Sequence, residues 1–288
     1  MTKLFFVLVA FFQIQAYALQ PNAGAQSSYY GQEFYATVLK QARDSQAKEA
    51  LRKILLAAHV YVQGGFDQIL SSCEGKQNCY AQTSLGYDGA RTFLFGSFYL
   101  VKVDSSNYGV KEMYCDRVYQ NADFKGGGRP GPGITPDSAV INTEHTWPQS
   151  RFNGRYSRDL QKADLHHLFP TDSQMNSIRG SNIFGEVTQD DGQAICNASR
   201  SGVGTAGPRE IFEPANPHKG HVARALFYMS IRYELPISQE EEIVLKKWNR
   251  EHPVDDEEYR RNDAIFKMQH NRNPFIDHPE LADQINDF

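Results

Sequence analysis

The side chains that could carry chemistry gather in two short segments of the chain. Glu144 is followed directly by His145, and a second segment, from Asp164 to Asn182, contains Asn176. A carboxylate and a side-chain amide both offer the oxygen ligands that Mg²⁺ prefers, and an imidazole titrates near neutral pH. A divalent ion offsets the negative charge of a phosphodiester and its poor leaving group, and a positioned base then activates water. These residue types therefore predict metal-assisted phosphodiester hydrolysis.

The simplest assignment gives each of three residues one role. Glu144 and Asn176 supply oxygen ligands to Mg²⁺, and His145 is the general base. Neighbouring residues at the end of a strand face opposite sides, so a bend must bring Glu144 and His145 to one site. An adjacent Glu-His pair is more often a surface coincidence than a catalytic dyad, so the pair alone carries little weight.

The pattern around these residues predicts the elements that position them. The apolar run Ala139–Ile141 is typical of a short strand and leads into Glu144 and His145. Thr171-Asp172 predicts the N-cap of a short helix that runs through Asn176–Arg179, and Gly180 ends it. We therefore expect the two chemical segments to lie on a strand and on a helix.

Elsewhere the chain alternates between helical and extended patterns. Apolar residues at helical spacing predict helices over 33–60, from 222 onward, over 240–248 and over 256–268. Residues 110–114 alternate like a strand, and 90–103 fit a buried helix or a strand. Residues 212–217 and 271–279 predict loops, and the glycine-rich stretch 126–133 predicts a flexible connection because it lacks the ending of a P-loop.

The N-terminus has the pattern of an export signal. Lys3 precedes a short apolar run, and Ala16-Tyr17-Ala18 is a small-x-small cleavage sequence. The run is shorter than the roughly 20 apolar residues that span a bilayer, and no cysteine for a lipid anchor follows it. We predict a signal peptide over 1–18 and one catalytic domain over 19–288, without a membrane anchor, in the periplasm or the medium and monomeric.

Four cysteines follow the signal: Cys73, Cys79, Cys115 and Cys196. An even number in an exported chain favours disulfides, and four cysteines permit three pairings. The short segment between Cys73 and Cys79 favours a local bridge, which would leave Cys115 with Cys196. A zinc site is the rival interpretation, but the Cys-x-x-Cys spacing typical of such sites is missing.

Charge is unevenly distributed along the chain. The formal net charge is −4, which argues against a protein that coats DNA stoichiometrically. From Lys125 to Lys162 six basic residues stand against three acidic ones, whereas from Ile237 to the end thirteen acidic residues stand against seven basic ones. A locally basic surface on an acidic protein is what a polyanionic substrate needs.

Several motifs in order resemble the bacterial endonuclease I family of secreted and periplasmic nucleases, within the ββα-metal (His-Me finger) superfamily. The resemblance covers most of the chain from about Tyr114 onward and the preceding part more loosely. It rests on Thr143–Pro148, Asp164–Pro170, the set Asn176, Arg179 and Asn182, Lys219–Met229 and Asn271–Pro279.

The resemblance implies a fold and a reaction. It implies an α+β protein in which a ββα-metal finger is embedded in a mostly helical single domain. It also implies cleavage of DNA, and of RNA as well, without sequence preference. Glu144 and Asn176 would hold one Mg²⁺, for which Ca²⁺ or Mn²⁺ could substitute. His145 would deprotonate water, and the products would carry 5′-phosphate ends.

The phosphate-holding arginine is less sharply defined by the resemblance. Arg151, Arg155 and Arg158 are the candidates for substrate contacts, and Arg179, one helical turn from Asn176, has either a catalytic phosphate-facing role or a structural one. We expect four further residues to hold the metal and base residues in place without contacting the substrate: Asp164, His166, His167 and Asn182. His167 stands where many relatives have Asn, but adjacent histidines point apart in regular structure, which disfavours a zinc site of His166 and His167.

Two rival functions remain open from the sequence. One is a secreted metal-dependent phosphodiesterase for a substrate other than nucleic acid, and the other is an inactive nucleic-acid-binding relative. The intact set of Glu144, His145 and Asn176 argues against the second. We also expect Arg224, the single charge on an apolar helix, to pair with a buried carboxylate, and Trp147, Tyr228 and Phe275 to lie in the core.

Overall fold

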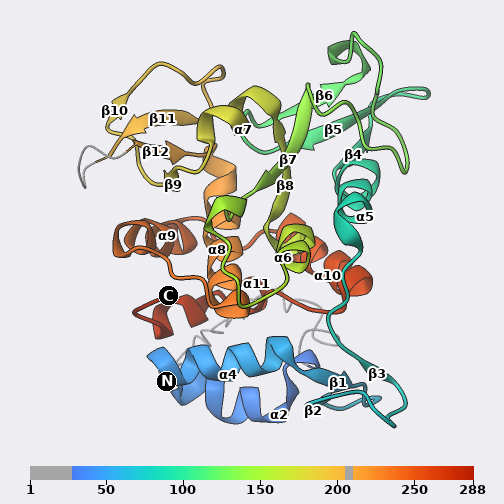
Figure 1. Ribbon diagram of the computed structural model, residues 1–288, viewed down its shortest axis with the longest axis vertical. Helices are drawn as coiled ribbons and strands as arrows, with labels where there is room; N and C mark the ends of the chain where they lie inside the picture. Colours follow the sequence, from blue (N-terminus) through green and yellow to red (C-terminus); the bar gives the residue numbers. More distant parts are fainter. Residues whose placement is uncertain (1–27, 205–209) are drawn as a thin grey trace, which may run out of the picture.

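The fold is described from a computed structural model that covers residues 28–204 and 210–288. The predicted signal peptide over 1–18 lies outside the described residues, as does nearly all of the polar segment that follows it. The described chain mixes helices with small sheets, as expected for an α+β protein. In Figure 1 the N-terminal helices lie at one end of the molecule and most of the strands lie at the other.

Helix α8 (Lys219–Tyr233) forms the centre of the helical part. All fifteen of its residues are buried, which is typical of a helix enclosed by other elements. It contacts α4 (Asp44–Leu56), α9 (Gln239–Glu251) and α11 (Pro274–Asp277). Figure 1 shows α8 passing through the middle of the molecule.

The helices that follow α8 begin at side-chain caps. Ser238 accepts a hydrogen bond from the backbone of Glu241 at the start of α9. Asp255 does the same for Glu258 at the start of α10 (Asp256–Gln269). Such caps satisfy backbone N–H groups that a helix start leaves open. Both helices therefore begin close to their predicted positions.

The site rests on a two-stranded antiparallel sheet followed by a helix. Strand β7 (Ile141–His145) pairs with β8 (Leu168–Asp172), so that Glu144 lies opposite Phe169 and His145 opposite Leu168. Helix α7 (Ser173–Arg179) follows β8 directly, with Asp172 as its N-cap and Gly180 as its C-cap. The predicted short helix is thus confirmed, together with the cap and stop residues.

Two further sheets lie beside this unit. One has the order β4-β5-β6 and the other β10-β11-β12-β9, in which β12 and β9 are parallel. The first contains β4 (Leu100–Lys102), β5 (Tyr108–Glu112) and β6 (Arg117–Gln120). The second contains β9 (Ile183–Phe184), β10 (Gln189–Asp190), β11 (Arg200–Val203) and β12 (Glu210–Glu213).

The predicted helix over 33–60 is wrong in its continuity. Residues from Gly31 form a helical segment in three pieces, α2 (Gly31–Glu33), a π-helical turn and α3 (Leu39–Gln41). The backbone becomes extended at Ala42 and Arg43 before α4 begins. Residues 58–60 then form β1 (Ala58–Val60), which pairs with β2 (Gln68–Leu70) and β3 (Cys79–Tyr80).

Two other predictions need correction, and the choice between helix and strand for residues 90–103 can be settled. Residues 90–103 contain both proposed structures in succession, the end of α5 (Gly86–Phe93), a π-helical turn and then β4. The predicted loop over 212–217 begins inside β12, and the predicted irregular tail contains the short helix α11. Residues 210–213 form a strand because they pair with β11, despite the turn-forming residues nearby. In the tail, the cap Asn273 followed by Pro274 starts α11.

The structure contains two disulfides, Cys73–Cys79 and Cys115–Cys196, which is the pairing that the spacing favours. The second bridge joins the turn between β5 and β6 to the segment before β11 across 81 residues of sequence. It therefore closes a loop that contains β7, β8 and α7.

Core positions agree with the sequence-based expectations. Trp147, Tyr228 and Phe275 are at most 1% exposed. The guanidinium of Arg224 donates through Nε and Nη2 to the buried carboxylate of Glu258, as a single charge in the apolar stretch 222–229 predicts. Among the described helices, none has the length and apolar character needed to cross a bilayer.

Candidate active site

Strand β7 carries Glu144 and His145, and helix α7, which carries Asn176, is joined to β7 by hydrogen bonds. The side-chain amide of Asn176 donates to Asn142 Oδ1 at 2.7 Å and to the carbonyl of Thr143 at 3.4 Å. These bonds join α7 to β7 within two residues of Glu144. They use the amide nitrogen of Asn176, and its oxygen has no hydrogen-bond partner among the described residues, so it is available to a ligand.

Glu144 is a buried carboxylate with one cationic neighbour. It is 1% exposed, and its Oε1 lies 2.8 Å from Nη1 of Arg179. Burial raises the pKa of Glu144, and the Arg179 guanidinium opposes that rise. Within the described chain, Oε1 accepts no aligned hydrogen bond despite this short distance. Buried polar atoms normally have such a partner, so the carboxylate retains capacity for a cation.

His145 has a defined tautomer because of its neighbours. Its Nε2 lies 3.2 Å from the carbonyl oxygen of Lys162, which can only accept, so Nε2 carries the proton. Its Nδ1 lies 3.4 Å from the amide nitrogen of Gln149. Burial lowers the pKa of His145 to about 3. The imidazole is therefore neutral near pH 7, with a lone pair on Nδ1 that can take a proton.

Gln149, Lys162 and Tyr87 contact the candidate base but were not among the predicted site residues. Tyr87 stacks on the His145 ring at 5.5 Å between centroids, and the Lys162 ammonium lies 4.2 Å from the Tyr87 ring centroid. Tyr87 comes from α5, far away in sequence, and nothing in its local pattern signals this contact. Lys162 is the last residue of the basic stretch 125–162, and this charge bias is the sequence feature that could have indicated it.

Arg179 holds the backbone on which the candidate residues stand. Besides its ion pair with Glu144, it donates to the carbonyls of His145 at 3.1 Å and Thr146 at 2.7 Å. Its side chain is 2% exposed and lies over the Phe184 ring at 4.5 Å. These contacts fit the structural alternative for Arg179 better than direct contact with a phosphate in solvent.

The other three arginines lie in different surroundings. Arg151 pairs with the buried carboxylate of Glu241 at 2.9 Å. Arg155 pairs with Glu234 at 3.0 Å and lines a cavity of about 660 Å³ beside α4. Arg158 donates to the carbonyl of Gln149 at 3.2 Å and to its Oε1 at 3.4 Å. Of these three, Arg158 is the one joined through a single residue to His145 Nδ1.

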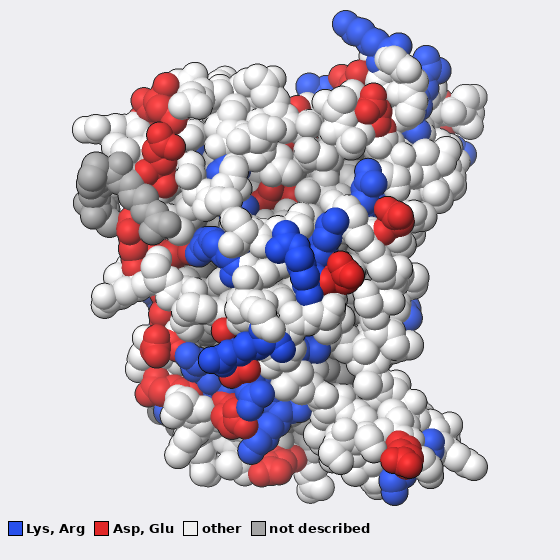
Figure 2. Space-filling view, in the orientation of Figure 1, with Lys and Arg blue, Asp and Glu red and all other residues white. Residues whose placement is uncertain are grey.

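Basic side chains gather on the face that carries this unit. Figure 2 shows Lys and Arg in the middle of the face, around helix α6 (Arg158–Ala163), and a second group with interspersed acids over α4. Arg158 and Lys162 both belong to α6. Two of the six basic residues in the predicted stretch, Arg158 and Lys162, therefore lie near His145.

Asp164, one of the residues expected to hold the site in place, is the centre of a buried polar network. Asp164 accepts hydrogen bonds from Tyr228 and Tyr233, each at 2.7 Å, and from Gln269 at 2.8 Å. Burial alone would raise the pKa of Asp164, but His166 and the hydrogen bonds from Tyr233 and Gln269 lower it. The carboxylate thus stays ionised and links the segment before β8 to α8 and α10.

His166 and His167 point to different partners, as adjacent residues should. His166 Nε2 lies 3.3 Å from the carbonyl of Asn271, and His167 Nε2 lies 2.8 Å from the carbonyl of Gln161. The His167 ring packs edge-on against His145 at 5.5 Å. Asn182 lies beside Arg179 through a backbone hydrogen bond of 3.0 Å.

The chain is similar in sequence to known nucleases. The profile of the family described as Endonuclease I matches residues 71–280. An extracellular ribonuclease of Bacillus subtilis (strain 168) is 40% identical over 162 residues, which cover 50% of this chain and 53% of the relative. An extracellular deoxyribonuclease of Aeromonas hydrophila is 32% identical over 117 residues, 40% of this chain and 49% of the relative. The chain spans about half the length of these relatives.

Proposed function

The chain belongs to the endonuclease I family, and we propose that it is an exported nuclease that hydrolyses phosphodiester bonds of DNA and RNA without sequence preference. The observation that carries the proposal is the bonding of α7, which carries Asn176, to β7, which carries Glu144 and His145 at its end. We assign this unit as the ββα-metal finger of a single catalytic domain over 19–288.

The donor set at this unit suits Mg²⁺. Glu144 offers a buried carboxylate whose Oε1 lacks an aligned hydrogen bond in the described chain, and Asn176 offers an amide oxygen. Mg²⁺ binds through one or two protein oxygens and keeps several waters. When bound, the ion would polarise the phosphate and stabilise the departing 3′ oxygen. Mn²⁺ or Ca²⁺ are chemically similar substitutes at such oxygen ligands.

The remaining steps belong to side chains of the chain itself. His145 is held with its proton on Nε2 by the Lys162 carbonyl, so Nδ1 accepts the proton of the attacking water. Gln149 lies 3.4 Å from Nδ1 and can orient that water. Cleavage of the bond to the 3′ oxygen leaves the phosphate on the 5′ end of the product. We place Arg179 as the residue that positions Glu144, rather than as a contact of the substrate.

Substrate contacts are proposed for the basic residues near His145. Arg158 and Lys162 lie on α6 beside the base, and Arg151 and Arg155 lie farther along the same basic stretch. Contacts to phosphates carry no sequence information, which fits an enzyme that cuts without preference.

Export is proposed on three grounds. Residues 1–18 have the pattern of a signal peptide, and the two disulfides suit an oxidising compartment. Relatives carry the names extracellular ribonuclease and periplasmic deoxyribonuclease. We therefore propose that the mature protein acts in the periplasm or the medium, as a monomer.

One experiment tests the activity. Mature protein is incubated with plasmid and with RNA, in Mg²⁺ or in EDTA, beside His145→Ala and the matched control His278→Ala. We expect cleavage of both substrates that EDTA and His145→Ala abolish and His278→Ala retains, and the ends should accept label only after phosphatase treatment. Intact plasmid and RNA in Mg²⁺ would overturn the proposal. Binding without cleavage would favour an inactive relative, and much faster turnover of bis-p-nitrophenyl phosphate would favour another phosphodiesterase.

A further inference from the structure

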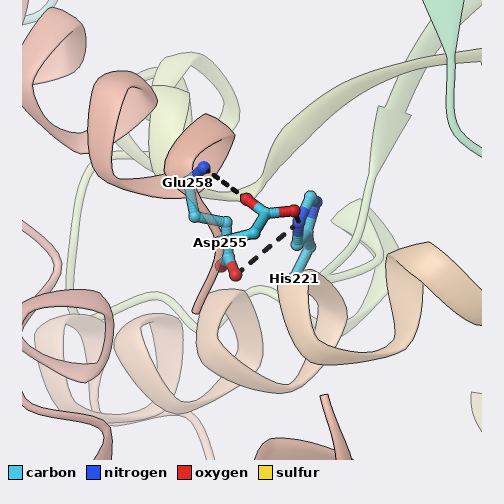
Figure 3. Close-up of side chains that lie close together, drawn as sticks. All are labelled: His221, Asp255 and Glu258. Atoms are coloured by element: carbon cyan, nitrogen blue, oxygen red, sulfur yellow. Dashed lines mark hydrogen bonds and ion pairs between the residues drawn. The ribbon is translucent and has the colours of Figure 1, made fainter. Parts of the chain in front are cut away.

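A second group of metal-ligating side chains lies away from the β7–α7 junction. His221, near the start of α8, meets Asp255 and Glu258 at the start of α10, as Figure 3 shows. One ligand atom from each residue lies within 4.8 Å of the other two. His221 Nε2 is 3.6 Å from Asp255 Oδ2 and 3.6 Å from Glu258 Oε2.

The imidazole of His221 lies within ion-pair distance of both carboxylates but beyond hydrogen-bond distance of either. Its side chain is 7% exposed, and 3.6 Å exceeds the length of a hydrogen bond. Its other nitrogen, Nδ1, is buried and has no partner among the described residues. Because buried polar groups normally have partners, these distances fit three ligands that surround an ion better than they fit three groups bonded to one another.

We propose that His221, Asp255 and Glu258 bind one divalent transition metal ion of the Zn²⁺ type. The shortest equal distance from an ion to the three ligand atoms is roughly 2.1 to 2.4 Å, close to the bond lengths of Zn²⁺ to nitrogen and oxygen. Asp255 is 57% exposed, so the ion can enter from solvent and keep water as a fourth ligand.

The surrounding charges select the class of ion. Arg224 already donates to both oxygens of Glu258, and this offsets one of the two carboxylate charges. Hard ions such as Mg²⁺ and Ca²⁺ prefer oxygen ligands and need several of them. A nitrogen ligand with partly neutralised carboxylates instead suits ions that bind imidazole well. The site therefore differs in kind from the oxygen donors Glu144 and Asn176.

The position of the site indicates a stabilising role. His221 belongs to the central helix, and Asp255 is the N-cap of α10. The His221 ring also stacks on Phe169 at 6.2 Å, and Phe169 pairs with Glu144 in the hairpin. An ion here would join α8 to α10 behind the hairpin. An ion that binds the folded chain alone stabilises it by mass action.

The test measures zinc binding and stability, without reliance on nuclease activity. Full-length mature protein with Glu144→Gln is used, so that the proposed Mg²⁺ ligand set does not contribute. After treatment with EDTA and its removal, Zn²⁺ binding is measured by equilibrium dialysis, and Co²⁺ is added to follow its visible absorption. The second changes are His221→Ala and Asp255→Asn, with Asp256→Asn, an exposed neighbour, as the matched control. Asp255→Asn retains an oxygen to cap α10.

We expect one Zn²⁺ per chain and a Tm raised by about 5 °C at zinc concentrations well above Kd. His221→Ala and Asp255→Asn should each weaken binding at least tenfold, and Asp256→Asn should leave it unchanged. Equal zinc binding by all four proteins, or absence of zinc binding and of Co²⁺ absorption in the Glu144→Gln protein, would overturn the site. Either result would leave the proposed nuclease activity untouched.

Discussion

The carboxylate of Glu144 and the guanidinium of Arg179 lie 2.8 Å apart, and each side chain is 2% exposed. Arg179 also holds the backbone carbonyls of His145 and Thr146. The same arginine thus sets the charge beside the proposed metal ligand and the path of the strand that carries it. Its removal should therefore affect folding as well as chemistry.

Arg179→Ala should destabilise the protein by about 3–5 kcal/mol, because it leaves the buried Glu144 carboxylate without its partner. The measurement is urea unfolding at pH 7, with Arg117→Ala as the control, since Arg117 forms a surface ion pair with Asp123. Surface pairs contribute at most about 1 kcal/mol. A loss for Arg179→Ala no larger than that of the control would contradict the structural role.

Stability should fall as the pH is lowered from neutral. Burial lowers the pKa of His145 to about 3 and the pKa values of His166 and His167 to about 4. Between these values and the ordinary pKa near 6.5, the unfolded chain binds protons that the folded chain does not. The stability that these histidines contribute is thus complete above about pH 6.5 and is lost as the pH falls, by about 1.4 kcal/mol per pH unit for each.

Urea unfolding at several pH values between 7 and 5 checks this dependence. His145→Gln removes one of the three groups, so the slope of unfolding free energy against pH should decrease by about 1.4 kcal/mol per unit. The exposed and non-titrating change Ser177→Ala should retain the slope of the unchanged protein. Stability independent of pH over this range would show that the three imidazoles are not held neutral by the fold.

The two disulfides should differ in their contribution. Loop-closure entropy gives about 4.5 kcal/mol for the bridge that closes 81 residues and about 2 kcal/mol for the bridge that closes 6. The paired variants Cys115→Ala with Cys196→Ala should therefore lower the unfolding free energy more than Cys73→Ala with Cys79→Ala. Denaturant unfolding of both double variants gives the comparison, and the reverse order would contradict it.

The sequence predicted the parts of the site that depend on local signals. The helix α7 has an N-cap in Asp172 and a stop in Gly180, and both are visible from one residue to the next. Arg224 is the one charged residue in the apolar stretch 222–229 of α8, which is enough to predict a buried carboxylate partner. Local signals failed where tertiary pairing decides the structure, as at β8, where Pro170 within the strand and the two histidines just before it do not predict pairing with β7.

Contacts between segments that are distant in the sequence could not be predicted from local patterns. The stacking of Tyr87 on His145 depends on how α5 packs beside α6, and no local pattern of Tyr87 encodes it. The same holds for the meeting of His221 with Asp255 and Glu258, because two separate helices supply the ligands. Arg151 resembles a substrate contact in sequence, yet its partner in the fold is the buried Glu241.

Asn176→Ala should raise the Mg²⁺ concentration for half-maximal cleavage by about tenfold or more, because it removes a proposed oxygen ligand. Asn176→Asp keeps an oxygen at the same place and should retain most of the Mg²⁺ affinity. Ser177→Ala, on the exposed side of α7, is the matched control. The readout is plasmid nicking against Mg²⁺ concentration. An unchanged Mg²⁺ requirement for Asn176→Ala would remove this residue from the proposed ligand set.

The effect of removing a basic residue on KM should depend on how close that residue lies to His145, not on its place in the basic stretch of the sequence. Arg158 reaches Gln149, which neighbours His145 Nδ1, and the Lys162 carbonyl holds Nε2 of the same ring. We expect Arg158→Ala and Lys162→Ala each to raise KM and to lower the slope of log KM against log salt by about 1, as loss of one phosphate contact predicts. Lys53→Ala, an exposed change on α4, is the control.

Arg155, paired with Glu234 beside the cavity near α4, should show a smaller effect than Arg158. If Arg155→Ala gave the larger loss, the substrate path would run over α4 instead of α6.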